Sequence, residues 1–381
     1  GRTAAAGAHG FQLAAGRRTA DSHRRCRDSR AGRLDDPRVP AAGRGAVASV
    51  LVGGPAAGRG GLAQCPRVAD LGRGADRPCG RSIHGAVGAD GDAVRQEERW
   101  IASRQVPLRL RFYEGAGRGG PTVVALHGLG TAVDVLRDAV PGFDPFARIA
   151  AEGFNVVGMD WPGHGRSGGR RGRLTYRLAM DAVADAGDAA AREWGGPVGV
   201  FGTALGGVLG FYAALEDERV VAVACHNVLD LRDVHPVLQR TRQGLLLPLA
   251  GRLRRWEALP EYVRVPTSAV VAASDLAADP DLSRVLRRHD QSVRSYDMGS
   301  LTALFLTPED KPAVEAQTTP TFVAVGTGDR VLPETASRAF VSRLTCESQL
   351  WVLPGGGHQL LLEHPEALVP QVAQFLRKHL M

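Results

Sequence analysis

The pattern of apolar and polar positions predicts alternating strands and helices from about residue 100 onward. Residues 106–113 alternate apolar and polar side chains, which is the period of a half-buried strand. Apolar positions at i, i+3, i+4 and i+7 from Met180 predict a helix. Further short apolar runs, each the length of a buried strand, lie at 122–126, 155–159, 198–201, 220–225, 321–325 and 349–353. Buried strands that alternate with helices predict an α/β fold: a mostly parallel sheet with helices on both faces.

The first 95 residues follow neither period. They contain one aromatic residue, Phe11, among repeated Gly, Ala and Arg. Such a composition buries too little apolar surface to offset the entropy that ordering costs. We therefore predict that residues 1–95 are a low-complexity, disordered leader and that the folded domain begins near residue 96.

One interval, 229–316, breaks the alternation with helical patterns, several prolines and no clear strand. We predict that it is a helical cap inserted into a core formed by residues 96–228 and 317–381. Ligands of open α/β sheets bind outside the carboxyl ends of the strands, so the cap is expected to roof a site there. Leu246 and Phe305 are the candidates for an acyl-binding wall, although most apolar cap residues are expected simply to pack on the core.

Charge is distributed unevenly along the chain. The chain has a formal net charge of +7, yet residues 1–95 contain 16 Arg and 8 Asp, so they carry +8 and the remainder carries −1. The main domain therefore offers no electrostatic case for binding nucleic acid. An RNA-associated role of the Arg-rich leader is kept as a minor alternative.

The five cysteines form no C-x-x-C pair, and no His cluster has metal-ligand spacing. We expect free thiols, no metal and no cofactor. No stretch approaches the roughly 20 apolar residues that span a bilayer, and no typical signal peptide is evident. We therefore expect no membrane span and a cytoplasmic location.

The strongest chemical signal is Gly-Thr-Ala-Leu-Gly-Gly at 202–207, between the strand at 198–201 and a helical run at 208–215. A strand-to-helix turn this sharp needs glycines, because side chains there would collide with the strand and the helix. This pattern is typical of a nucleophile elbow, whose apex is a serine. Here the apex is Ala204, so the reacting oxygen is missing. Thr203 cannot replace it, since neighbouring side chains on such a turn point in different directions.

The turn His127-Gly128-Leu129-Gly130 follows the strand at 122–126. Its backbone should therefore lie at the carboxyl edge of the sheet, beside the elbow. We predict that the N–H groups of Leu129 and Leu205 form an oxyanion hole. His127 is interpreted as bracing this loop.

Asp329 and His358 each stand in a Gly-rich turn directly after a predicted strand. Both turns should reach the same sheet edge as Ala204. The chain order nucleophile, acid, base is the order that this architecture uses. We predict that His358 takes the nucleophile's proton and that Asp329 orients the imidazole and stabilises its charged form.

Together with Asp-Trp-Pro-Gly-His-Gly-Arg-Ser-Gly-Gly at 160–169, these motifs resemble the α/β-hydrolase superfamily over about residues 100–381. The stretch at 163–169 and the helical insertion are similar to its monoacylglycerol lipase and lysophospholipase-like branch. The resemblance implies the α/β-hydrolase fold and an acylglycerol or lysophospholipid-like ester as substrate. His164 and Ser167 follow a different strand and are interpreted as structural.

The sequence therefore predicts a serine-type carboxylic-ester hydrolase that is inactive because Ala204 replaces its nucleophile. All other predicted partners of the missing hydroxyl remain, which favours an engineered change of an active serine to alanine. The alternative is a naturally non-catalytic ligand-binding protein of the same fold. The sequence does not indicate an oligomeric state.

Overall fold

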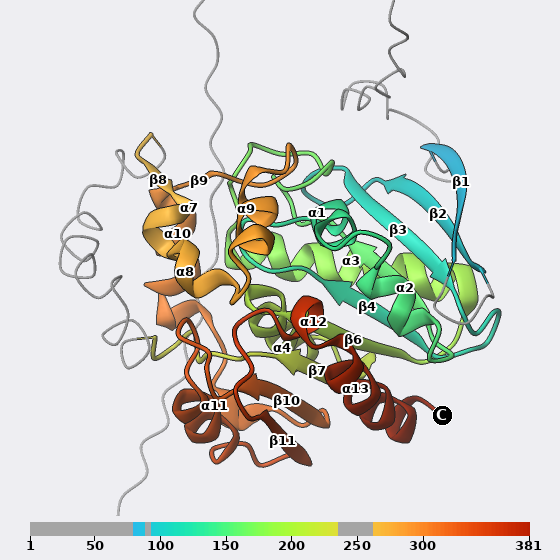
Figure 1. The fold of residues 1–381 in the computed structure, drawn as a ribbon. Coiled ribbons are helices and arrows are strands. Elements are labelled where there is room, and N and C mark those ends of the chain that lie inside the picture. The colour runs from blue at the N-terminus through green and yellow to red at the C-terminus, as the bar shows by residue number, and fades with distance from the viewer. Residues whose placement is uncertain (1–78, 88–92, 235–261) are drawn as a thin grey trace, which may run out of the picture. The chain divides into compact units, whose positions relative to one another are not determined.

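The computed structural model describes residues 79–87, 93–234 and 262–381 of the chain. A nine-stranded sheet organises them, in the spatial order β1-β2-β3-β5-β4-β6-β7-β10-β11 (Figure 1). Its strands are β1 (Cys79–Val87), β2 (Ala93–Ile101), β3 (Leu108–Glu114), β4 (Thr122–Leu126), β5 (Asn155–Met159), β6 (Val198–Thr203), β7 (Val220–His226), β10 (Thr321–Gly326) and β11 (Ser348–Leu353).

The sheet is parallel from β5 to β11 and antiparallel at its other end. β4 pairs in parallel with β5 and β6, and β7 pairs in parallel with β6 and β10. β1, β2 and β3 join as an antiparallel extension. The predicted fold class, a mostly parallel sheet in an α/β chain, is confirmed. Parallel strands bring their carboxyl ends to one edge, which sets the position of the site.

Helices cover both faces of the sheet, and each face has its own apolar cluster. Figure 1 shows these layers around the strands. One face carries α3 (Tyr176–Trp194), α4 (Leu205–Glu216) and α11 (Glu334–Val341). The other carries α1 (Val133–Ala139), α2 (Pro145–Ala150), α12 (Leu360–Glu363) and α13 (Pro365–Leu380).

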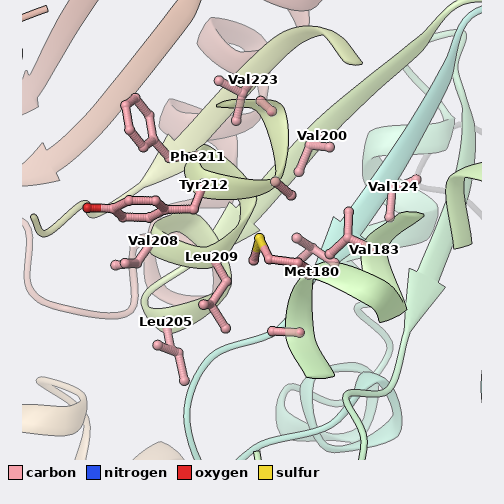
Figure 2. Close-up of a cluster of buried hydrophobic side chains, with 14 of the residues drawn as sticks. Val124, Met180, Val183, Val200, Leu205, Val208, Leu209, Phe211, Tyr212 and Val223 are labelled. Carbon is pink, nitrogen blue, oxygen red and sulfur yellow. The ribbon is translucent and has the colours of Figure 1, made fainter. Parts of the chain in front are cut away.

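Helix α4 lies deep in the first cluster. Its side chains face the sheet and α3, where Leu209 is grouped with Met180, Val183 and Val200 (Figure 2). A helix that is apolar on all sides is expected to be buried. The buried helix fixes the first residue of α4, and therefore the turn that precedes it, against the sheet.

The described part of the predicted cap contains short helices and a small sheet. The elements are β8 (Arg264–Pro266), α7 (Thr267–Val270), α8 (Ala273–Leu276), α9 (Pro280–Arg288), β9 (Ser295–Asp297), α10 (Met298–Phe305) and the 3₁₀ turns Pro308–Asp310 and Val314–Ala316. The expectation that this interval lacks strands is wrong, because β8 and β9 pair antiparallel. Three-residue strands are too short to show a period of two.

The described strands also begin before the predicted start at residue 96, which falls inside β2. Residues 1–78 and 88–92 of the predicted leader lie outside the described residues. The sequence of β2 hid this strand, because its buried side chains include charged ones. Glu98 accepts from Arg109 at 2.9 Å, and Arg99 pairs with Glu97 at 2.6 Å. Because ion pairs neutralise these buried charges, β2 lacks the alternation of apolar and polar residues by which a strand is predicted from sequence.

Candidate active site

Ala204 forms the apex of a tight turn between β6 and α4. Its backbone has φ +50° and ψ −120°, a conformation that non-glycine residues rarely adopt. The turn requires glycines at 202 and 206. A Cβ on Gly202 would lie 2.1 Å from the carbonyl oxygen of Gly206, and one on Gly206 would lie 2.3 Å from that of Leu126. The backbone therefore has the geometry predicted for a nucleophile elbow, with a methyl group at its apex.

The hydroxyl of Thr203 is engaged elsewhere. Its Oγ1 lies 2.9 Å from Nδ1 of His226, a fully buried side chain at the end of β7. Thr203 itself is buried. This contact agrees with the expectation that Thr203 does not replace the missing apex hydroxyl.

The structure brings Asp329 and His358 together at the same edge of the sheet. Nδ1 of His358 lies 2.8 Å from Oδ2 of Asp329, and both side chains are buried. Asp329 follows β10 and His358 follows β11. A hydrogen bond from Nδ1–H to the carboxylate leaves Nε2 unprotonated on the neutral ring, which is the tautomer a general base needs.

The other oxygen of Asp329 is held by the backbone. Oδ1 accepts from the N–H groups of Val331 at 2.7 Å and Leu332 at 2.8 Å. Burial raises the pKa of Asp329, but the charge and hydrogen bond of His358 and these two N–H groups outweigh burial, so its pKa lies below the ordinary value. The carboxylate stays ionised and can stabilise an imidazolium on His358.

Two residues near this pair were not singled out by the sequence. Nδ2 of Asn227 lies 3.3 Å from Nδ1 of His358 and 3.3 Å from Nε2 of His226. Asn227 has φ +69°, so its backbone is also in the left-handed region. These two residues, His226 and Asn227, stand at the end of β7. The sequence could have pointed to them only as polar residues at the carboxyl end of a strand that lies between the strands of two candidate loops.

The loop after β4 lies against the elbow. A Cβ on Gly128 would stand 3.2 Å from that of Ala204. Among the described residues, the backbone N–H groups of Leu129 and Leu205 have no hydrogen-bond acceptor. The loop that contains Leu129 thus lies beside the apex, and neither predicted donor N–H bonds to a described residue.

Buried histidines form hydrogen bonds within this loop and with the residues that pack against it. Nε2 of His127 accepts from the N–H of Trp161 at 3.2 Å, and the Trp161 indole donates to the His127 carbonyl at 2.9 Å. His164 is fully buried and lies 2.6 Å from the hydroxyl of Tyr296. Ser167 donates to the carbonyl of Asp160 at 2.7 Å. These contacts agree with the structural interpretation of His127, His164 and Ser167.

A cavity of about 190 Å³ lies between the core loops and the described cap residues. Leu129, Thr203, Ala204 and His358 line it from the core. From the cap it is lined by Thr267, Ser268, Val271, Leu276, Leu286, Arg287, Ser292, Val293 and Arg294. Apex, imidazole and loop therefore share one cavity.

Phe305 is not among the described residues that line this cavity. Phe305, at the end of α10, packs instead against the core cluster that contains α3 and α4. Leu246 lies outside the described residues.

No group of three or more His, Cys, Asp or Glu side chains among the described residues is arranged to hold a metal ion. No described helix combines the length and apolar character needed to cross a membrane. Cys225 and Cys346 are free thiols, and burial raises the pKa of Cys225, so it is unreactive.

A parallel sheet with this strand order, an elbow after β6, and an Asp–His pair after β10 and β11 define an α/β-hydrolase. Residues 120–365 match the family described as "Serine aminopeptidase, S33". The chain belongs to this family.

Relatives and solved structures agree with this assignment. The chain is 24% identical over 298 residues to a 2-hydroxy-6-oxo-6-(2'-aminophenyl)hexa-2,4-dienoic acid hydrolase of Metapseudomonas resinovorans, covering 74% of this chain and 91% of the relative. It is 26% identical over 303 residues to a haloalkane dehalogenase of Mesorhizobium japonicum, covering 71% and 90%.

Two solved lipases share the fold. A monoacylglycerol lipase of Paleococcus ferrophilus superimposes with a TM-score of 0.58 at 20% identity, covering 72% of this chain and 99% of that one. A soluble variant of the monoglyceride lipase of Saccharomyces cerevisiae gives 0.59 at 16% identity, covering 74% and 95%. The resemblance to the monoacylglycerol lipase-like branch is thus confirmed at the level of fold.

Proposed function

We propose that this chain is the scaffold of a serine-type carboxylic-ester hydrolase whose nucleophile position is occupied by Ala204. The observation that carries the proposal is the 2.8 Å contact between His358 and Asp329 beside an elbow whose apex keeps φ +50°. Strain of this kind costs of order 1–3 kcal/mol and concentrates at active sites. The chain as it stands is expected to be inactive.

A serine at position 204 completes an acyl-transfer site. Nε2 of His358 takes the hydroxyl proton while the oxygen attacks the ester carbonyl, and the N–H groups of Leu129 and Leu205 bind the resulting oxyanion. The imidazolium then protonates the departing alcohol. Water, activated by the same imidazole, hydrolyses the acyl-enzyme to the free acid.

We propose lipid esters, acylglycerols or lysophospholipid-like molecules, as the substrate class. The support is the fold shared with two monoacylglycerol lipases and the apolar side chains among the residues that line the cavity. Leu246 and Phe305 stay proposals for an acyl wall, and Phe305 is the weaker, since it does not line the described cavity.

The test is the Ala204→Ser variant, compared with the unaltered chain on short- and long-chain esters and with a fluorophosphonate probe. Because alanine already occupies the strained conformation, the change adds only an oxygen atom. Loss of such a nucleophile typically costs on the order of 10⁶ in turnover. We expect a gain approaching that size and covalent labelling at position 204.

The matched controls are the double variant Ala204→Ser with His358→Gln, which should lose both activity and labelling, and Ala204→Ser with Ser167→Ala, which should keep labelling. A folded Ala204→Ser variant that is neither labelled nor active on any ester contradicts the catalytic proposal. Tight binding of an ester without turnover would then favour a non-catalytic ligand-binding protein.

A further inference from the structure

The cavity beside Ala204 carries positive charge. Arg287 and Arg294 both line it from the cap, and none of the described residues that line it is Asp or Glu. The carboxylate of the candidate site, Asp329, already pairs with His358. The two guanidinium groups therefore give the cavity a net positive field.

Among the described residues, Arg287 has no carboxylate partner, which a partly buried arginine normally has. It stands in the last turn of α9, where its Nη2 donates to the carbonyl oxygen of Val271. Its Nε is buried without a hydrogen-bond partner, and among the described residues no carboxylate forms an ion pair with it. Burial lowers the pKa of Arg287 from its ordinary value, and no described charge offsets this effect.

Other arginines in the chain differ from it. The buried Arg109 contacts Glu98 and Asp134, and Arg99 contacts Glu97. On α9 itself, Arg284 pairs with Asp281, while Arg288 is exposed and does not line the cavity. A cation that is partly desolvated and unpaired is costly, unless a ligand supplies the counter-charge.

We propose that Arg287 and Arg294 form an anion subsite, so that the ester this site accepts carries a carboxylate or phosphate group. The inference rests on the proposed function and narrows its substrate class. Within that class it favours charged, lysophospholipid-like esters over neutral acylglycerols. Arg287, which lines the cavity and pairs with no carboxylate among the described residues, supplies the inner contact, and Arg294, at the exposed rim, attracts the anion by charge.

The unaltered chain suits an equilibrium test, because without a nucleophile it binds esters without consuming them. Titration calorimetry at low salt compares monoethyl glutarate with diethyl glutarate for the carboxylate arm. For the phosphate arm it compares 2-(butyryloxy)ethyl phosphate with 2-hydroxyethyl butyrate. We expect the charged member of at least one pair to bind about tenfold more tightly, and the arm that shows this preference identifies the anion. The preference should shrink in 0.5 M salt.

Arg287→Gln should abolish the preference for the charged ester, and Arg294→Gln should reduce it. Arg288→Gln is the matched control on the same helix and should leave it unchanged. Thermal unfolding of each variant shows whether it is folded. If Arg287→Gln does not fold, the exposed Arg294→Gln variant decides by itself.

A charged-to-neutral affinity ratio near one in the unaltered chain, or a ratio that neither arginine variant alters, overturns the subsite. Arg287 then serves only to tie α9 to Val271. The two proposals fail separately. An inactive Ala204→Ser variant with an intact anion preference removes the catalytic proposal alone, whereas an active variant that does not distinguish the paired esters removes only the subsite.

Discussion

The hydroxyl of Tyr296 accepts a hydrogen bond from the backbone N–H of Gly130 at 2.7 Å, although 166 positions separate the two residues. The same hydroxyl lies 2.6 Å from Nε2 of His164, to which it donates its proton. Tyr296 is fully buried in the cap. A single cap side chain thus holds the loop that presents the N–H of Leu129.

Tyr296→Phe removes both hydrogen bonds and leaves a buried N–H and a buried imidazole nitrogen unpaired. We expect a loss of about 1–3 kcal/mol in the free energy of unfolding. In the Ala204→Ser background, kcat should fall more than KM rises, because the proposed oxyanion donor, the N–H of Leu129, is displaced. Urea titration and ester kinetics measure the two effects. Tyr262→Phe, at a side chain that is 79% exposed, should change neither.

Three buried histidines should make stability depend on pH. Burial lowers the pKa of His127 to about 4 and those of His164 and His226 to about 3. In the unfolded chain each titrates near 6.5, so below that pH protons bind the unfolded state first. Stability is therefore complete above pH 6.5 and is lost as the pH falls toward 4, by about 2 kcal/mol per histidine at pH 5.

Urea unfolding at pH 7.5 and pH 5 measures this loss. The His164→Gln variant starts less stable, but its loss between the two pH values should be smaller by about 2 kcal/mol. His364→Gln removes an exposed histidine and should leave the loss unchanged. Identical pH dependence in the His164 variant and the unaltered chain would show that His164 is not neutral in the folded state.

Two glycine substitutions should act in opposite directions. A Cβ on Gly206 would lie 2.3 Å from a carbonyl oxygen of the sheet, so Gly206→Ala must displace α4 from the elbow and should cost more than about 3 kcal/mol. A Cβ on Gly187, inside α3, meets nothing within 4 Å. Gly187→Ala should therefore stabilise the protein by about 0.5–1 kcal/mol. Thermal unfolding of the two variants shows whether Gly206→Ala lowers the stability and Gly187→Ala raises it.

Arg109 holds together a buried group of acids. It is fully buried, lies 2.9 Å from Glu98 and 2.8 Å from Asp134, and stands 3.5 Å from Asp160. Arg109→Met leaves these carboxylates without their main counter-charge and should cost about 3–5 kcal/mol. Arg95→Met breaks an exposed pair with Glu114 in the same sheet and should cost less than about 1 kcal/mol. Similar losses in chemical denaturation would mean that Arg109 is not a buried counter-charge.

The same arginine marks where sequence patterns fail. The alternation at 106–113 predicted a half-buried strand, and β3 is there, but Arg109 and Arg111 are buried as well. Their partners come from β2 and α1, which a local period does not register. Apolar strands such as β4 and β6 were predictable because burial on both faces leaves a continuous hydrophobic run.

At the candidate site, the sequence indicated every position whose local pattern is a Gly-rich turn after a strand. Ala204, Asp329 and His358 are of this kind, and the structure gathers them at one edge. For Asn227 the only local signal was its polar character at the end of a strand, and for Arg287 there was none, because the relevance of both depends on tertiary neighbours rather than on spacing. Phe305 shows the converse: its apolar character was read correctly, but its direction depends on how α10 rests on the core.

The strained backbone at Ala204 also determines how many mutations separate this chain from one with a serine at that position. Each alanine codon (GCN) differs from a serine codon (UCN) only in its first base, so one point mutation exchanges the methyl group for the hydroxymethyl group. The φ of +50° is already maintained with a side chain present, so this exchange needs no second, permissive substitution in the fold. A glycine there would adopt the same φ without the strain that a side chain adds. At the level of the gene, the Ala204→Ser exchange is therefore a single step.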